Sequence, residues 1–79
     1  MLRWLTCKIE KGMFSDEFNI AVQTIQGDLV SLFVPREMTD LEKQRVQVRV
    51  FQDGPRTVAI MPDENQSIIN VNSSELQPI

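Results

Sequence analysis

Apolar and polar residues alternate most clearly between residues 45 and 62 of the chain. The run Val46–Val50 places a valine at every second position, which is the pattern of a half-buried β-strand. Turn-forming residues at 53–55 interrupt the run, and a second apolar run follows at 57–61. The pattern therefore predicts a β-hairpin, and the other elements are placed by how they would pair with it.

The length of the turn decides which residues of this hairpin share a face. A two-residue turn at Asp53-Gly54 sets Val50 opposite Thr57, whereas a loop of three or five residues around Gly54 sets Val50 opposite Val58. Because a one-residue slip exchanges the two faces of a strand, we expect the odd loop, which makes one face wholly apolar. The same choice directs Phe51 and Met61 outward.

A second hairpin is predicted between residues 18 and 34, around a glycine turn at 26–28. A three-residue loop sets Val22 opposite Leu32 and fills one face with apolar side chains. That face comprises Phe18, Ile20, Val22, Val30, Leu32 and Val34. The opposite face then carries Ile25, Leu29 and Phe33.

The rest of the chain supplies two outer strands and two short turns. A first strand at 2–11 has Leu5, Cys7 and Ile9 on one face, and a last strand at 67–71 directs Ile69 and Val71 inward. A Thr-x-x-Glu capping box at 39–42 predicts one helical turn over 40–44. Residues 72–76 suit a capped 3₁₀ turn.

Six short strands at regular spacing predict an all-β protein, and a length of 79 residues favours a small barrel over two full sheets. The element order is a strand, a long loop at 12–17, two hairpins and a last strand that enters a short turn. This order resembles an SH3-like barrel over most of the chain, as topology and without a family-specific motif. The resemblance implies one domain over 1–79, a five- to six-stranded SH3-like barrel with a short helical turn near 40–44. An OB-like barrel, with 38–44 as its intervening helix, is the alternative.

The charge distribution disfavours nucleic-acid binding. The net charge is −3, and residues 36–56, the most basic segment, hold five basic and four acidic groups. No segment concentrates the positive charge that a phosphate backbone attracts. The alternative function is a nucleic-acid-binding small barrel that uses Arg45, Arg49 and Arg56 with Phe51 as a stacking platform.

Candidate chemistry is sparse in this sequence. The absence of histidine removes the commonest general base and metal ligand, and the one cysteine, Cys7, is in phase with the apolar face of its strand. The acidic pairs at 16–17 and 63–64 are interpreted as solvated loop charges. We therefore expect no enzymatic activity, no cofactor and no metal. No apolar run approaches the roughly 20 residues of a membrane span, and the unpaired cysteine suits a cytoplasmic setting.

The positive functional signal is a surplus of large apolar residues on faces that a barrel should expose. These residues either contact a protein partner, form a minor second core under residues 36–44 and the termini, or form a symmetric homodimer contact. We expect a non-enzymatic interaction or structural module. Its candidate partner-binding residues are Trp4, Phe33, Phe51, Met61 and Arg49.

Overall fold

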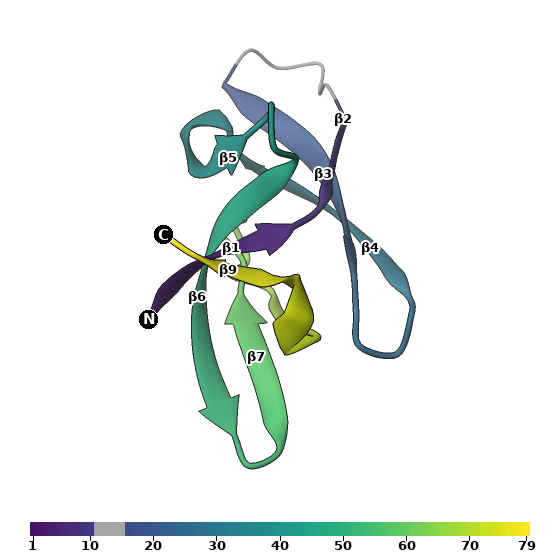
Figure 1. Cartoon of the computed structure of the whole chain (residues 1–79). Coiled ribbons are helices and arrows are strands. Elements are labelled where there is room, and N and C mark those ends of the chain that lie inside the picture. Colours follow the sequence, from purple (N-terminus) through teal and green to yellow (C-terminus); the bar gives the residue numbers. More distant parts are fainter. Residues whose placement is uncertain (11–15) are drawn as a thin grey trace.

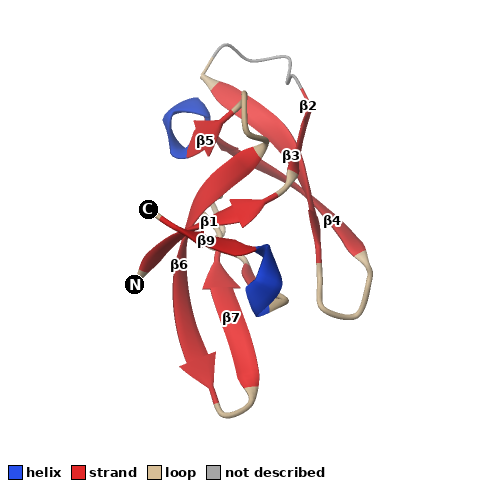
Figure 2. Ribbon diagram, viewed as in Figure 1, coloured by secondary structure: helices blue, strands red, loops and turns tan. Residues whose placement is uncertain are grey.

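The computed structural model describes residues 1–10 and 16–79, whose regular elements are β-strands and two short 3₁₀ helices (Figure 1; Figure 2). The predicted all-β class is confirmed, whereas most of the predicted loop at 12–17 falls outside the described residues. The strands are β1 (Leu2–Thr6), β2 (Lys8–Glu10), β3 (Glu17–Gln23), β4 (Leu29–Pro35), β5 (Thr39–Asp40), β6 (Arg45–Asp53), β7 (Arg56–Ile60), β8 (Ile68–Asn70) and β9 (Leu76–Pro78). The 3₁₀ helices are η1 (Arg36–Met38) and η2 (Ser73–Glu75).

The strands form two antiparallel sheets that do not close into one barrel. The six-stranded sheet has the order β8-β7-β6-β1-β9, with β5 beside β6, and the three-stranded sheet has the order β2-β3-β4. A closed barrel needs ladder hydrogen bonds around its whole circumference, whereas β4 pairs only with β3 among the described strands. The strands of the predicted small barrel therefore do not close on themselves, because β4 ends the smaller sheet as an open edge.

One nearly continuous strand passes from the larger sheet into the smaller one. β1 and β2 are separated by Cys7 alone, so that Leu5 belongs to the ladder with β6 and Ile9 to the ladder with β3. Gln44 holds this bend: its carbonyl accepts from the Cys7 N–H at 3.1 Å, and its side-chain Oε1 accepts from the Ile9 N–H at 2.8 Å. Such a bend lets one strand contribute the same apolar side to both sheets.

The core lies between the inner faces of the two sheets. The inward residues predicted for the first strand are confirmed, since Leu5, Cys7 and Ile9 are each at most 9% exposed. Each large apolar side chain buried here stabilises the fold by about 1.5–3 kcal/mol. The buried cluster comprises Leu5, Cys7, Ile9, Ile20, Val22, Val34, Val46, Val48, Ala59, Met61, Ile69 and Val71.

The hairpin of β3 and β4 keeps the predicted faces in a different register. Val22 pairs with Val30, rather than with Leu32, because a five-residue loop replaces the three-residue loop. The Thr24 N–H closes this loop on the Asp28 carbonyl at 2.8 Å. Since the error is two residues, every side chain stays on its predicted face: Ile20, Val22 and Val34 are buried, and Phe18, Val30 and Leu32 pack against the core.

The hairpin of β6 and β7 contradicts the predicted odd loop. Val50 pairs with Ala59, so the connection is the two-residue turn Gly54-Pro55. Gly54 has φ +62, as a type II′ turn requires of its first central residue, and Pro55 lies outside the ladder, where its missing N–H removes no bond. The register differs from the predicted one by a single residue, and the faces of β7 are exchanged. Met61 is consequently a core residue, 1% exposed, and its predicted outward position is wrong.

The helical turn predicted after β4 is not found at its predicted position. No helix covers 40–44; η1 precedes β5, and residues 41–44 form a turn. Asp40 rather than Thr39 caps this turn, because Asp40 Oδ1 accepts from the Lys43 N–H at 3.1 Å while the Thr39 hydroxyl donates to the Arg36 carbonyl. At the C-terminal end the predicted 3₁₀ turn is confirmed as η2, capped by Asn72, and it leads into β9, a strand that the sequence analysis did not predict.

Candidate interaction surface

The structure divides the five predicted partner-binding residues among three places. Trp4, Arg49 and Phe51 lie on the outer face of the six-stranded sheet, the face turned away from the core. Phe33 lies on the outer face of the other sheet and is 52% exposed. Met61 is buried in the core. Their partner-binding role stays a prediction, and only the first three share a face.

A cross-strand row of side chains, which we call the outer row, crosses this face beside Phe51. The strand registers align its members directly: Leu2 of β1 opposes Arg49 of β6, Arg49 opposes Ile60 of β7, and Ile60 opposes Ile68 of β8. Leu2 is 46% and Ile68 is 68% exposed. Neighbouring strands lie about 4.8 Å apart, so the outer row is an apolar band with one guanidinium in it.

A hollow of about 250 Å³ opens beside the outer row. Leu2, Arg49 and Ile60 contribute to its wall, and Met38 and Pro62 line it from the segments that follow β4 and β7. Within residues 1–10 and 16–79, the Arg49 side chain makes no hydrogen bond or ion pair. Gln47, Asp63 and Gln66 also line the hollow, which is therefore a mostly apolar recess with polar groups and an available cation at its margin.

Trp4, on the same face, is covered by side chains of this chain. The Arg45 guanidinium lies 4.5 Å from the centre of the Trp4 ring, a distance suited to a cation–π contact. Arg45 also contacts Asp40 at 3.1 Å and donates to Gln77 Oε1 at 2.9 Å. The Lys43 N–H, and then Arg45, lower the pKa of the Asp40 carboxyl, which keeps it ionised beside Arg45. Residues 40–45 and β9 thus cover Trp4, as the alternative of a minor second core requires. Phe51, in contrast, stays 46% exposed.

The three arginines of the alternative function share the outer face, as their alternate positions on the hairpin require. Arg45 and Arg49 lie four residues apart on β6, and Arg56, the first residue of β7, opposes Asp53. Arg45, however, is held by Trp4, Asp40 and Gln77. The face therefore presents two available arginines, at opposite ends of the β6–β7 ladder.

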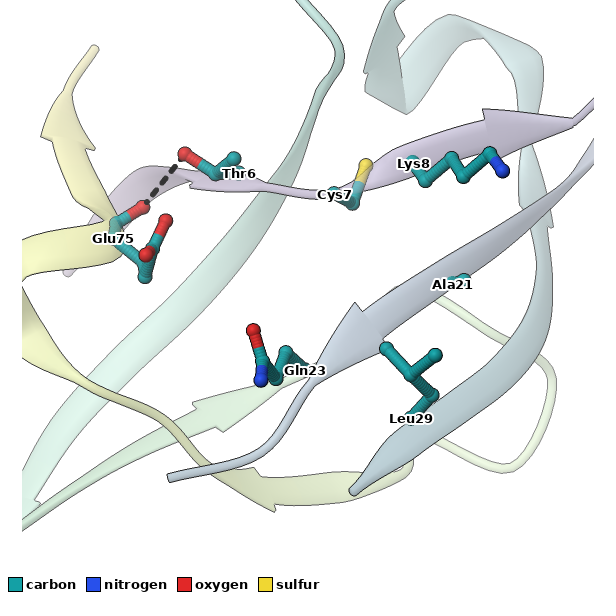
Figure 3. A pocket seen from close by; sticks show the side chains of 7 residues that line it. All are labelled: Thr6, Cys7, Lys8, Ala21, Gln23, Leu29 and Glu75. Carbon is teal, nitrogen blue, oxygen red and sulfur yellow. Dashed lines mark hydrogen bonds between the residues drawn. The ribbon is translucent and has the colours of Figure 1, made fainter. Parts of the chain in front are cut away.

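A second hollow, of about 300 Å³, lies at the bend of the first strand and contains the one cysteine (Figure 3). Thr6, Cys7 and Lys8 line one side of it, and the Thr6 hydroxyl donates to the Glu75 carbonyl at 3.3 Å across it. Burial raises the pKa of the Cys7 thiol to about 12. The thiol is therefore neutral at physiological pH and is not prepared to act as a nucleophile.

The interpretation of the acidic pair at 63–64 as solvated loop charges is wrong for Asp63, which has a structural use. Asp63, 9% exposed, accepts from the Ser67 N–H at 2.7 Å and from the Ser67 hydroxyl, and it shapes the loop between β7 and β8. Among the residues that the structure describes, no three His, Cys, Asp or Glu side chains gather into a potential metal site.

Comparison of the chain with protein-family models, with curated proteins and with solved structures finds no match in any of the three. In the described part of the chain, no helix has the length and apolar character to cross a membrane.

Sequence reasoning found Arg49 and Phe51 of this surface and missed the rest of the outer row. Ile60 was assigned to the core by the odd loop, so its place in the row was hidden by the one-residue error. Ile68 alternates with the buried Ile69, and that alternation was the available signal for an outward position. Leu2 is likewise out of phase with the buried Leu5 on the first strand.

Proposed function

We propose that this protein is a small non-enzymatic interaction module that binds a protein partner with the outer face of its six-stranded sheet. The observation that carries the proposal is the outer row, in which exposed apolar side chains flank Arg49 beside a hollow. Interface centres are enriched in large apolar groups and arginine, seated in recesses that exclude water. The fitting partner inserts an apolar side chain into the hollow and pairs a carboxylate with Arg49.

Two further expectations, on the fold likeness and on the cellular setting, accompany this proposal. We keep the likeness in element order to SH3-like modules, here in the form of two sheets linked by a bent strand. We also keep the cytoplasmic setting, because the thiol of Cys7 is unpaired and buried, as suits a reducing compartment.

The proposal is tested by changing the outer row while leaving the core unchanged. Partner proteins retained by the immobilised chain are identified, purified and titrated against the wild type, Ile68→Asp and Arg49→Glu. We expect each variant to weaken binding at least roughly tenfold, the loss of one anchor residue. Leu29→Asp is the matched control, since Leu29 is a comparably exposed residue on the other sheet, 73% exposed.

Urea unfolding of the same variants separates binding from folding. Surface substitutions of this kind change the free energy of unfolding by about 0.5 kcal/mol or less. If both variants bind as the wild type does, or if the control loses binding equally, the outer row is not the binding surface.

The alternative, single-stranded nucleic-acid binding, is favoured by one observation: Arg49, Arg56 and the exposed Phe51 share the outer face. Titration with a fluorescent oligonucleotide at increasing salt tests it directly. Binding that falls steeply with salt and is lost in Arg49→Glu and Phe51→Ala supports this alternative, and no measurable binding at low salt excludes it.

A further inference from the structure

The edge strand of the smaller sheet, β4, is longer and less protected than the other edge strands. Sheet edges present unpaired backbone groups, and proteins protect them with short strands, charged residues or proline. In the described chain β2, β8 and β9 end the sheets as strands of three residues each, with charges flanking Ile9 in β2 and Pro78 in β9. β4 is seven residues long and contains no charged residue, and its one proline, Pro35, stands at its last position, so that the six residues before it are unprotected. It lies at the outer margin of the molecule in Figure 1.

The backbone groups that β4 leaves unpaired can be assigned residue by residue. The Thr24 N–H donates to the Asp28 carbonyl, and the Arg36 N–H donates to the Asp16 carbonyl, so even-numbered residues of this segment face β3. Hydrogen-bonded and non-hydrogen-bonded pairs alternate along an antiparallel ladder. Leu29, Ser31 and Phe33 therefore direct their N–H and C=O groups away from β3, toward the open edge.

The sequence of this edge is self-complementary about Ser31. Leu29 and Phe33 lie two positions on either side of it, and Val30 and Leu32 one position on either side. When two such strands pair antiparallel with Ser31 opposite Ser31, exposed Leu29 meets exposed Phe33 on the outer face, and half-buried Val30 meets half-buried Leu32 on the inner face. Pro35, which has no N–H, stays outside the central ladder.

The charges at the ends of the strand agree with this orientation. Asp28 precedes β4 and Arg36 follows it, and both belong to the even-numbered residues. In the antiparallel pair centred on Ser31, Asp28 of one copy becomes a diagonal neighbour of Arg36 of the other, about 7–8 Å away, within reach of long side chains. A parallel pair would bring like charges together instead.

We propose that β4 pairs with β4 of a second copy of this chain, antiparallel and with the two-fold axis at Ser31. Each Leu29–Phe33 pair and the central Ser31 pair then exchange both backbone hydrogen bonds, and the two small sheets become one six-stranded sheet. The pairing lies on the opposite sheet from the outer row and does not rest on the proposed function. A contact limited to one strand is small, so the dimer is weak and depends on concentration.

Sedimentation velocity of the wild type from micromolar to millimolar concentration tests the pairing. We expect the mass to rise from that of the 9.1 kDa monomer to twice that value. Ser31→Lys, which sets two like charges opposite each other at the two-fold axis, should remain monomeric across the same range. Asn19→Lys is the matched control, because Asn19 opposes Phe33 on the same face of β3, one strand from the edge. It should dimerise like the wild type.

A cross-link tests the register and does not depend on how Ser31→Lys folds. In a hydrogen-bonded antiparallel pair the two Cα atoms lie about 5.5 Å apart, within the span of a disulfide. Ser31→Cys in a Cys7→Ala background should therefore oxidise to a covalent dimer, whereas Thr24→Cys in the same background should not.

Three results would overturn the proposal. They are a wild type that stays monomeric at every concentration, a dimer that Ser31→Lys leaves intact, and a Ser31→Cys chain that cross-links no faster than the Thr24→Cys control. If a different protein pairs one of its strands with β4, the wild type alone would stay monomeric, and a complex with that protein would form instead.

Discussion

The two hairpins of this protein resemble each other in sequence and differ in construction. Each has two alternating strands around a glycine with positive φ, Gly27 in the first and Gly54 in the second. β3 and β4 are joined by a five-residue loop, and β4 is an open edge. β6 and β7 are joined by a two-residue turn and lie inside the larger sheet, with neighbours on both sides.

In these hairpins, whether a loop holds an odd or an even number of residues matters more than its length. In the first hairpin the predicted loop was wrong by two residues, and every side chain kept its face. In the second the predicted pairing was wrong by one residue, and the faces of β7 were exchanged. An apolar face that looks complete, such as Val50 opposite Val58, is therefore weaker evidence for register than the turn chemistry of Gly54 and Pro55.

The largest expected effect tests the parity of the second hairpin. Met61→Ala should lower the free energy of unfolding by about 2–5 kcal/mol, because it leaves a cavity in the core. Ile60→Ala removes a partly exposed side chain on the opposite face and should cost less. Urea unfolding of both variants measures the difference. A larger loss for Ile60→Ala than for Met61→Ala would support the odd loop instead.

An intermediate effect compares the two turns. Gly54→Ala should destabilise the protein by about 1–2 kcal/mol, since a side chain disfavours φ +62 and a two-residue turn has no other residue to absorb the strain. Gly27→Ala, at φ +94 in the five-residue loop, should cost less, because the longer loop can adjust. Thermal and urea unfolding measure both costs. Equal losses would show that loop length does not relieve the strain.

An effect that is absent at neutral pH concerns Cys7, at the bend between the sheets that carry the two hairpins. Burial raises the pKa of its thiol from 9.0 to about 12. The unfolded chain therefore loses this proton at lower pH than the folded chain, so stability is constant below about pH 9 and falls as pH rises toward 12. Urea midpoints of the wild type should decline over this range more steeply than those of Cys7→Ala. Parallel declines would contradict a buried thiol.

The alternation of apolar and polar residues within each strand predicted most of the core. It could not predict which strands pair with one another. Leu5, Ile9 and Val46 were placed inward because a strand alternates by itself, whatever its neighbours are. The open edge at β4 and the strand β9 depend on which segments meet, and no local pattern encodes that meeting.

The residues of the candidate surface were predictable where the sequence alone assigned each side chain to the correct face of its strand. Arg49 and Phe51 were found because β6 alone fixes their direction. Met61 was misplaced because its direction depends on the turn, and Trp4 was expected to be open because its cover, Arg45, comes from a strand 41 residues away.

The bent strand of β1 and β2 also governs how the molecule comes apart. Because one bent strand belongs to ladders in both sheets, with Gln44 bonded on either side of the bend, unfolding of either sheet disturbs a strand with which the other sheet pairs. Melting is thus expected to be all-or-none. The emission of Trp4 in one sheet and the hydrogen exchange of Ile20 in the other should follow the same transition.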